Sequence, residues 1–582
     1  MDNADAALFA ERESFTAAIV ESDADKRVIV SGPGTGKTTT FRRVAKESAR
    51  PVLVLSFMRR LVDDLTEDLE GLASVYTFHG YAYLQLRETS VQGITRSFKF
   101  YPPLLELVSS DLSWLAGLDV SPQAIQVAFN TLNESSSEVA QALASGDYYD
   151  AVSYSDSVYR LLRHYREDLS RVPTTGQLIV DEYQDFCRME VELIALLSRS
   201  SPVLIVGDDD QALYWRRGAS PEFIRDVARS GDYHLFELPF CSRCPEVVVN
   251  ATNAVLDRAL SLGLLKDRVE KRFECFLPAK RSVINDFPKI RHVHCTVQSR
   301  QANSNYMARY IARRIAEIPR SDILESYELR QPTALVIGPP HVAEQVHEGL
   351  ERELGRVELK VGGTDEVQLL EGYKFLDSDP DSRLGWRIVT YVDPPGDMKR
   401  ILHETLELGR EWRDALPEEY VERHARNRAT MVSIQRGDEM ALEDAESLGA
   451  VGLDRSQLRG PPEAELIGTE EPEGSVDGRE VVGEELPARV MVTTFPGSKG
   501  LQAPYVFLVG VNQPELPARN DAPTDHEVCS FIVALTRAVK SCEILSCGRL
   551  SGLARAPSQF LRWIGEFTER IRVDRDYWKL RS

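Results

Sequence analysis

Short apolar runs punctuate the chain, separated by longer stretches in which polar and apolar residues mix. They lie at residues 27–30, 51–57, 75–80, 177–182, 203–208, 333–338, 489–495 and 505–511. Most are rich in valine, leucine and isoleucine and are short enough to be strands buried on both faces of a parallel sheet. The pattern therefore predicts an α/β fold in which helices connect parallel strands.

Two stretches lack such runs and instead show the helical spacing of leucine, tyrosine and alanine. The second of them ends in an acidic, Pro/Gly-rich segment at 460–485, which is expected to be a solvated linker. We therefore expect two α/β cores, each with a mostly helical insertion. The expected boundaries are 1–87 with 171–275 for the first core, 88–170 for its insertion, 276–384 with 489–582 for the second core, and 385–488 for the second insertion and linker.

The first apolar run leads directly into a glycine-rich turn that ends in Lys37 and Thr38. Glycine tolerates positive φ and has no Cβ, so successive N–H groups of such a turn can converge on phosphate oxygens. A helix beginning near Lys37 adds the positive end of its dipole. Lys37 is expected to neutralise the β- and γ-phosphates, and the Thr38 hydroxyl to bind Mg²⁺. The expected nucleotide contacts are Gly32, Pro33, Gly34, Thr35, Gly36, Lys37, Thr38 and Thr39.

Two later runs end in acidic residues, at the strand ends where open parallel sheets bind their ligands. Asp181 and Glu182 follow one another, and adjacent strand residues point to opposite sides, so the two carboxylates can act separately. We expect Asp181 to hold Mg²⁺ through water and Glu182 to polarise the attacking water. Gln211, shortly after Asp208, is a candidate sensor of the γ-phosphate.

Composition narrows the class of partner. The chain has 582 residues, a formal charge of −21 and a pI near 5.1, which excludes a polybasic nucleic-acid binder because no global field attracts a polyanion. Any DNA partner requires a local basic surface. The start of the chain is acidic and no apolar run approaches the roughly 20 residues of a membrane span, so we expect a cytoplasmic protein with no membrane partner.

Eight cysteines are scattered along the chain, as expected for reduced thiols. Cys241 and Cys244 form a CxxC pair, with Cys275 and Cys295 following. This set could hold Zn²⁺ or an iron–sulfur cluster. The alternative is a group of buried apolar thiols, since the last two cysteines do not form a second CxxC.

Several short motifs occur in an order that resembles superfamily 1A DNA helicases of the UvrD/Rep/PcrA kind, from about residue 28 to 548. The motifs are Gly32-Pro-Gly-Thr-Gly-Lys-Thr38, Ser56-Phe-Met-Arg-Arg60, Thr77-Phe-His-Gly80, Asp181-Glu-Tyr-Gln-Asp185, Val206-Gly-Asp-Asp-Asp-Gln-Ala-Leu-Tyr214 with Arg217-Gly-Ala219, Ser242-Arg243, Thr494-Phe-Pro-Gly-Ser-Lys-Gly-Leu501 and Ala534-Leu-Thr-Arg-Ala538. Several motifs in the right order are a far stronger signal than any one of them.

The resemblance implies two RecA-like domains, 1A and 2A, with ATP and Mg²⁺ at their interface and helical insertions 1B and 2B. It also implies 3′→5′ movement on single-stranded DNA. Phosphoryl transfer needs cations around the γ-phosphate, and the resemblance assigns that role to Arg243 and Arg537. The implied catalytic set is Lys37, Asp181, Glu182, Gln211, Arg243 and Arg537, with Gly500 and Gln502 as further nucleotide contacts and Thr38 and Asp181 as Mg²⁺ ligands.

On the DNA side the resemblance points to aromatic residues, which stack on any base at about 1 to 3 kcal/mol each. Arginines nearby could supply the local positive charge that phosphate contacts require. The DNA-side candidates are Phe57, Arg59, Arg60, His79, Tyr214, Trp215, Arg216 and Arg217. The alternative for Phe57 and Tyr214 is a place in the core.

The chain departs from the family pattern where the base and ribose are recognised. Residues 9–19 contain no glutamine to read adenine, and Ser242 stands where an aromatic residue usually precedes the arginine, with Phe240 as a possible substitute. Gln502 and Pro496 replace an expected Glu and His, and Trp215 lies one place early. ATP remains the expected nucleotide, with relaxed selectivity for the base.

The expected function is an ATP-dependent 3′–5′ DNA helicase or single-stranded DNA translocase acting on single-stranded or tailed DNA in DNA repair or phage defence. The alternative is a nucleotide-gated regulatory ATPase subunit that controls a partner nuclease or effector without processive unwinding. No nuclease motif occurs in the chain, so cutting would need a partner protein. A degenerate scaffold is disfavoured by Lys37, Glu182 and Arg537, which are all present.

Overall fold

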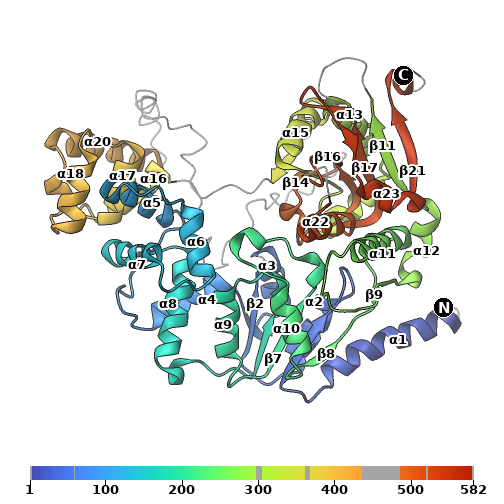
Figure 1. Cartoon of the computed structure of the whole chain (residues 1–582), viewed down its shortest axis with the longest axis horizontal. Coiled ribbons are helices and arrows are strands. Elements are labelled where there is room, and N and C mark those ends of the chain that lie inside the picture. Colours follow the sequence, from blue (N-terminus) through green and yellow to red (C-terminus); the bar gives the residue numbers. More distant parts are fainter. Residues whose placement is uncertain are drawn as a thin grey trace.

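The computed structural model describes residues 3–57, 59–296, 304–360, 367–435, 486–518 and 522–579. Two sheet-containing bodies lie beside one another, and a group of helices is attached to the first of them (Figure 1). Within these ranges no helix combines the length and the apolar character needed to cross a bilayer. The expected linker at 460–485 lies outside the described residues.

The first sheet has the strand order β3-β2-β6-β7-β1-β8, and all its strand pairs are parallel. Its strands are β1 Lys26–Val30, β2 Val52–Ser56, β3 Ala73–Thr77, β6 Gln177–Val180, β7 Val203–Gly207 and β8 His234–Phe236. Val28 and Val30 enter the core on one face and Ile29 the core on the other, because alternate strand residues point to opposite sides.

Helices cover both faces of this sheet. One face packs on α1 Asn3–Val20, α2 Lys37–Glu47 and α3 Arg59–Asp68, and the other on α4 Phe78–Glu88, α9 Arg188–Leu197 and α10 Glu222–Arg229. Burial on both faces explains why the strands are continuous apolar runs rather than alternating ones.

The second sheet is also parallel throughout, in the order β13-β14-β12-β15-β17-β11-β21. Its strands are β11 Ile290–Cys295, β12 Ala334–Gly338, β13 Glu358–Lys360, β14 Val490–Thr494, β15 Ala503–Leu508, β17 Ala538–Cys547 and β21 Thr568–Val573. One face packs on α11 Glu246–Ser261, α22 Asp525–Leu535 and α23 Phe560–Trp563, and the other on α13 Ser304–Ala316 and α15 Pro340–Leu354. Further helices are α12 Leu277–Asp286, α14 Arg320–Glu328 and α24 Arg575–Lys579.

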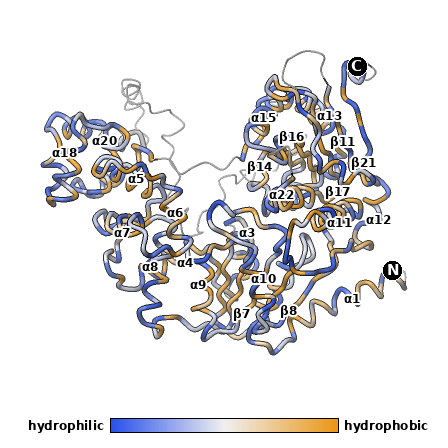
Figure 2. Tube along the Cα trace, viewed as in Figure 1, coloured by the Kyte–Doolittle hydropathy of each residue, from blue (hydrophilic) through white to orange (hydrophobic). Residues whose placement is uncertain are grey.

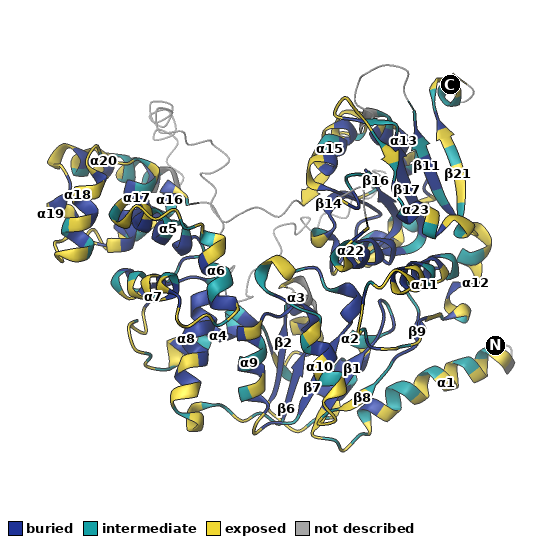
Figure 3. Cartoon of the chain, in the orientation of Figure 1, coloured by how far each residue is buried: buried dark blue, intermediate teal, exposed yellow. Residues whose placement is uncertain are grey.

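The two sheets with helices on both faces confirm the expected fold class of two RecA-like domains. Figure 2 shows hydrophobic residues concentrated along both sheets, and Figure 3 shows their central strands buried, whereas the edge strand β21 carries exposed residues. The expected boundary at residue 275 does not coincide with the point at which the chain begins to pack on the second domain. Although α11 precedes that boundary, it packs against α22 and α23 of the second domain.

The insertion into the first domain is largely helical. It comprises α5 Leu104–Ala116, α6 Pro122–Asn130, α7 Ser137–Tyr149 and α8 Tyr154–Glu167, with a two-residue ladder between β4 Lys99–Phe100 and β5 Ala151–Val152. Side-chain caps begin several of these helices, for example Ser121 accepting from the N–H of Ala124 and Ser136 from that of Val139.

The helices inserted into the second domain pack on the first insertion. They are α16 Leu369–Ser378, α17 Arg383–Val392, α18 Met398–Leu402, α19 Trp412–Ala415 and α20 Glu418–Gln435. They begin before the expected boundary at 385, because the apolar side of α16, with Leu369, Tyr373 and Leu376, is buried among helices rather than on the sheet. In Figure 1 this group lies beside α5, on the side of the molecule away from the second sheet.

A buried ion pair joins the two insertions. Arg387 on α17 donates from Nε to Oδ1 of Asp111 on α5 at 2.7 Å, and the Tyr149 hydroxyl on α7 donates to Oδ2 of the same carboxylate at 3.0 Å. Both charged side chains are almost fully buried. The two helical groups therefore share one core.

Candidate active site

The phosphate loop connects β1 to α2. The N–H of Ser31 donates to the carbonyl of Gly207 at 3.1 Å, which fixes the start of the loop to the neighbouring strand β7. Gly34 and Gly36 have φ of 68° and 95°, in the left-handed region that favours glycine. Lys37 begins α2, and its Nζ donates to the carbonyls of Ser31 and Gly32 at 2.8 and 2.9 Å. The ammonium group thus lies inside the turn, where a phosphate can replace the carbonyl contacts.

The segment around Arg243 lies directly on this loop. The N–H of Ser242 donates to the carbonyl of Gly34 at 2.9 Å. A Cβ added to Gly34 would lie 2.4 Å from Cβ of Arg243 and 3.2 Å from Sγ of Cys241. A glycine is required here because the two segments approach more closely than a side chain permits, and this approach brings Arg243 to the phosphate site.

Asp181 and Glu182 follow β6 at the carboxyl edge of the sheet. The N–H of Asp181 donates to the carbonyl of Leu55 at 3.0 Å, and Glu182 adopts a left-handed φ of 57°. Burial, reinforced by Glu182, raises the pKa of Asp181 despite the attraction of Lys37. For Glu182, burial opposes ionisation, but Lys499 and Lys37 outweigh it and lower its pKa. A Mg²⁺ ion beside Asp181 would supply the missing positive charge, so the residues present fit the metal. Thr38, in the first turn of α2, offers the second expected ligand.

The second domain reaches this site through Arg537, which lies between α22 and β17 and is almost fully buried. Its Nη2 donates to Oε1 of Gln211 at 3.1 Å, and Nε2 of Gln211 donates to Oδ2 of Asp208 at 2.5 Å. A chain of hydrogen bonds therefore runs from a guanidinium of one domain to a strand end of the other.

The site carries mutually repelling cations. Burial lowers the pKa of Lys37, and the charge of Arg243 lowers it further. Burial and then Arg243 lower the pKa of Arg537 to about 9. A group of anions placed among these side chains would relieve both the repulsion and the burial cost, which is the chemistry of a polyphosphate site.

Lys499 was not predicted from the sequence, although it reaches the same acids. It lies after β14 in the second domain, is 2% exposed, and its Nζ is 3.3 Å from Oε2 of Glu182 and bonds to Asp185 and to the carbonyl of Gln211. Burial opposes its charge, but Asp185 and Glu182 raise its pKa. Its position between Ser498 and Gly500, within one of the motifs that resemble the helicase family, was the one sign of a functional role.

Replacing Lys499 by methionine is expected to lower the free energy of unfolding by about 3–5 kcal/mol, because it leaves buried Asp185 without its counter-ion. Urea unfolding monitored by fluorescence measures the change. Lys360→Met, at an exposed lysine of the same domain, is the matched control and is expected to change the midpoint little. Equal midpoints for the two variants would contradict a stabilising role for the interdomain pair.

Gly500 and Gln502 flank Leu501, whose carbonyl accepts from Nη1 of Arg537 at 3.3 Å. Gly500 has a left-handed φ of 74°, and the side chain of Gln502 donates to Oε1 of Gln331 at 3.2 Å. The structure therefore brings both residues close to Arg537, and the Gln502 side chain is hydrogen bonded within its own domain.

Comparisons with known proteins agree with this geometry. Residues 16–217 match the family model described as an AAA domain. ATP-dependent DNA helicase UvrD1 of Mycobacterium tuberculosis is 26% identical over 296 residues, which are 40% of this chain and 37% of that protein. DNA helicase II of Escherichia coli is 26% identical over 248 residues, 34% of this chain and 33% of that protein. ATP-dependent DNA helicase PcrA of Bacillus subtilis is 25% identical over 235 residues, or 33% and 32%.

The matched family segment contains the phosphate loop, the acidic strand end and Gln211, and it covers the first sheet from β1 to β7 together with the helical insertion. The resemblance to UvrD-like superfamily 1 helicases is confirmed. The matches span about a third of the length of these relatives. These relatives are all named as helicases, so the comparisons do not favour the alternative of a regulatory ATPase subunit.

A cavity of about 230 Å³ adjoins the phosphate loop where the base and ribose of a nucleotide are expected. It is lined from α1 by Phe9, Arg12, Glu13, Phe15 and Thr16, from the loop and α2 by Thr35, Gly36, Thr39, Thr40 and Arg43, and by Leu238, Pro239 and Phe240. The guanidinium of Arg12 lies 4.6 Å from the ring centroid of Phe276. Aromatic and arginine side chains thus occupy the place where the family pattern has a glutamine.

The DNA-side candidates lie in two groups. In the first, the rings of Phe57 and Tyr214 are 4.6 Å apart, and the guanidinium of Arg217 lies 5.0 Å from the Phe57 ring centroid. Phe57 and Tyr214 are half-buried against core residues, so they are neither fully core nor freely exposed. His79 lies in the first turn of α4 with its Nδ1 3.2 Å from the carbonyl of Tyr154, and burial, reinforced by Arg217, lowers its pKa to about 4.

The second group is open to solvent. Trp215 is 52% exposed, with the His526 ring of the second domain edge-on at 5.4 Å and the Arg216 guanidinium 5.5 Å from its own ring centroid. Arg59, at the start of α3, is exposed as well, whereas the side chain of Arg60 lies outside the described residues. Trp215 therefore presents a half-exposed aromatic ring where the two domains meet.

The four cysteines do not meet in one metal site, because the fold carries Cys295 away from the other three, of which Cys275 lies beside Cys241 and Cys244. Cys295 lies on β11 opposite Cys547 of β17 in the second sheet, whereas Cys241 and Cys244 lie at the phosphate loop. All eight cysteines are free. In the part of the chain that the structure describes, the group of three potential metal ligands within reach of one another is Asp208, Asp209 and Asp210 instead.

These three carboxylates already have cationic partners. Nζ of Lys271 lies 2.8, 2.5 and 2.8 Å from Asp208, Asp209 and Asp210, in that order. Arg225 and Arg268 pair with the second and third acids at 3.0 and 2.7 Å. The cluster therefore serves to lock the loop after β7, on which Gln211 lies.

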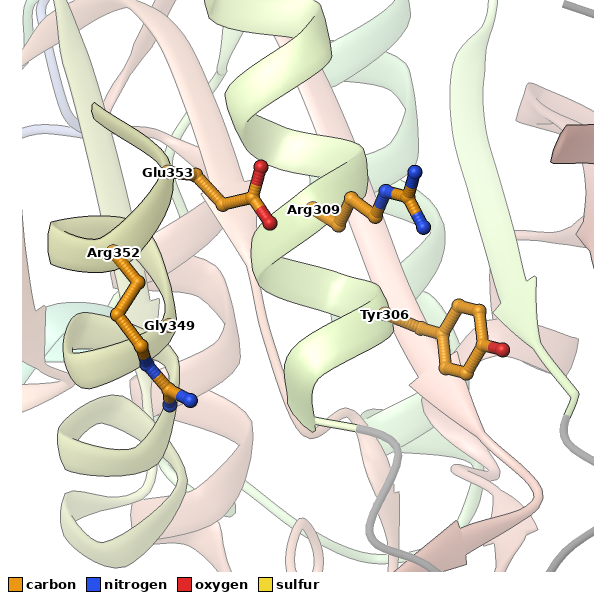
Figure 4. Close-up of a pocket in the computed structure, with 5 residues that line it drawn as sticks. All are labelled: Tyr306, Arg309, Gly349, Arg352 and Glu353. Atoms are coloured by element: carbon orange, nitrogen blue, oxygen red, sulfur yellow. The ribbon is translucent and has the colours of Figure 1, made fainter. Parts of the chain in front are cut away.

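A further cavity, of about 240 Å³, lies between α13 and α15 and is lined by Tyr306, Arg309, Gly349, Arg352 and Glu353 (Figure 4). The guanidinium of Arg309 also lies 4.6 Å from the ring centroid of Trp578, which anchors α24 on α13. The residues expected to bind nucleotide or DNA are not among its lining.

Proposed function

We propose that the protein is an ATP-driven motor that moves 3′→5′ along single-stranded DNA and separates the strands of a tailed duplex. The residues of the nucleotide site and of the DNA side take the roles predicted from the sequence, and Lys499 is added to the nucleotide site. The proposal is supported by the relatives, which are named as ATP-dependent DNA helicases.

The observation that carries the proposal is the contact of Arg537 with Gln211 across the two domains. Hydrolysis changes the charge of the phosphate group that these side chains surround. Since the two residues belong to different domains, a change at the phosphate alters the separation of the domains. A nucleotide site built this way couples chemistry to movement.

Within the site we assign the roles by charge and reach. Lys37, Arg243 and Arg537 hold the equatorial phosphate oxygens, which carry the charge of the transition state. Glu182, held ionised, orients and polarises the attacking water. Thr38 and Asp181 hold Mg²⁺, which when bound neutralises charge on the phosphate oxygens.

On DNA the motor grips bases through Phe57, Tyr214 and Trp215, and phosphates through Arg59 and Arg217. Aromatic stacking tolerates every base, so grip does not depend on sequence. Because Trp215 contacts His526 of the second domain, the relative movement of the domains changes this grip in step with hydrolysis.

The test is hydrolysis of ATP by the purified chain with and without single-stranded DNA, followed by strand separation of duplexes with a 3′ or a 5′ tail. ATP, GTP and CTP are compared in parallel, and removal of Mg²⁺ with a chelator is the control. We expect hydrolysis stimulated by DNA, separation of the 3′-tailed duplex, and appreciable use of other nucleotides. No hydrolysis in either condition overturns the proposal, and preference for the 5′ tail overturns its polarity.

A further inference from the structure

Two thiols stand on either side of Arg243. The N–H of Cys244 donates to Sγ of Cys241 at 3.4 Å. Both residues are 0% exposed. A CxxC segment that precedes a helix, as this one precedes α11, is an arrangement in which a disulfide can form without moving distant parts of the chain.

The pair lies in the contact between the two domains. On one side Sγ of Cys241 packs against Gly34 of the phosphate loop. On the other, Sγ of Cys244 donates to the carbonyl of Thr536 in the second domain at 3.4 Å, next to Arg537. Cys244 is therefore in direct contact with the second domain, and Cys241 with the phosphate loop of the first.

The surroundings favour a reactive thiolate. Burial opposes ionisation of Cys241, but hydrogen bonds from Cys244 and the charge of Arg243 outweigh it and lower its pKa to about 7. A thiolate is the form of cysteine that attacks peroxides, so a thiol that ionises near neutral pH is readily oxidised. Lys280, buried nearby with its Nζ 3.2 Å from the carbonyl of Val539, adds a second positive charge that interacts with both thiols.

We propose that Cys241 and Cys244 form a reversible disulfide when a peroxide reaches them between the separated domains, and that this oxidation stops nucleotide hydrolysis. The second half of the proposal rests on the proposed function. The Cys241 thiolate attacks the peroxide O–O bond, giving a sulfenic acid and releasing hydroxide, or an alcohol anion from an organic peroxide. The Cys244 thiol then displaces hydroxide from that sulfur. Two thiols are oxidised, and hydrogen peroxide is reduced to two waters.

The disulfide changes the site in two ways. An S–S bond of about 2.05 Å draws the two sulfurs far closer than a hydrogen bond does, so the segment that carries Arg243 must shift. Because Arg243 lies so close to Gly34, such a shift breaks its contact with the phosphate loop or displaces the loop itself. Oxidation also removes the S–H that Cys244 donates to Thr536, and with it a contact between the domains.

The first experiment detects the disulfide between Cys241 and Cys244 directly. The full chain is treated with hydrogen peroxide, alkylated without reduction and digested with trypsin, which cleaves after Arg243. A disulfide then links the peptides 230–243 and 244–258, which mass spectrometry detects and which dithiothreitol separates. We expect this linked pair to be the main oxidised product. Oxidation that stops at separate sulfinic acids, or that joins Cys275 instead, overturns the assignment.

The same digestion with a non-hydrolysable ATP analogue present tests the access step. Because the bound nucleotide holds the domains together, the linked peptides are expected to form at least threefold more slowly. An unchanged rate contradicts entry between the domains.

The second experiment reads activity. Peroxide is expected to lower DNA-stimulated ATP hydrolysis of the chain at least tenfold, with recovery in dithiothreitol. Cys244→Ser is expected to lose this reversible response, and Cys275→Ser, at a half-buried thiol nearby, is the matched control that keeps it. Formation of the linked peptides with no change in hydrolysis overturns the regulatory half alone. A chain with no hydrolysis before oxidation instead counts against the proposed function, while the peptide assay remains valid.

Discussion

Replacing Lys37 by alanine is expected to lower the rate of ATP hydrolysis by about a hundred- to a thousandfold. Lys37 is the cation held inside the phosphate loop, and its Nζ contacts only carbonyls there that a phosphate can replace. Without it, negative charge developing on the phosphate oxygens loses its nearest fixed partner. A coupled phosphate-release assay at saturating single-stranded DNA measures the effect.

Lys46→Ala is the matched control, since Lys46 is an exposed lysine in the last turn of the same helix. It is expected to hydrolyse ATP at close to the normal rate. Titration with a fluorescent nucleotide separates loss of binding from loss of turnover in the Lys37 variant. If Lys37→Ala hydrolyses ATP as fast as Lys46→Ala, the phosphate loop is not the catalytic cradle.

Replacing Arg537 by alanine is expected to lower hydrolysis by about a thousandfold or more, the scale on which an arginine supplied to a phosphoryl transition state acts. The affinity for ATP is expected to change far less, because the phosphate loop belongs to the other domain. The distinguishing result is a large fall in kcat with a KM near the normal value. DNA-dependent hydrolysis at several ATP concentrations gives both values.

Two further variants sharpen the interpretation. Arg537→Lys keeps the charge but cannot donate in the same fork, so a partial recovery is expected. Arg562→Ala, at an exposed arginine of the second domain, is expected to behave normally. Circular dichroism checks that the Arg537 variants remain folded, since this side chain also bonds to the carbonyl of Val533. A folded Arg537→Ala protein with normal kcat would remove Arg537 from the catalytic set.

Local signals in the sequence predict much of this architecture. The run before Ser31 predicts a strand, and β1 ends at Val30 with α2 starting at Lys37. The acidic strand end at Asp181 lies where an open parallel sheet places its ligand, one residue after β6. These features depend on a few adjacent residues, so a single chain reveals them.

Features that depend on contacts between distant segments were missed or wrong. Lys499 matters because it crosses to Glu182 and Asp185, and nothing in its neighbours distinguishes it from a surface lysine. The idea of a four-cysteine metal site did not hold for the same reason. Spacing along the chain does not reveal that Cys295 lies on β11, away from the other cysteines. The early start of the second helical group reflects burial of α16 against other helices, which its own apolar residues do not reveal.

The buried ion pair between Asp111 and Arg387 holds the two helical insertions together as one rigid unit. Pulling these charges apart without new partners would cost about 3–5 kcal/mol, far more than thermal energy. The two helical groups are therefore held together as one cap on the first domain, although one of them is inserted into the sequence of the second domain. In the motor proposed above, the second sheet therefore moves relative to an assembly of cap and first sheet, with DNA bound between them.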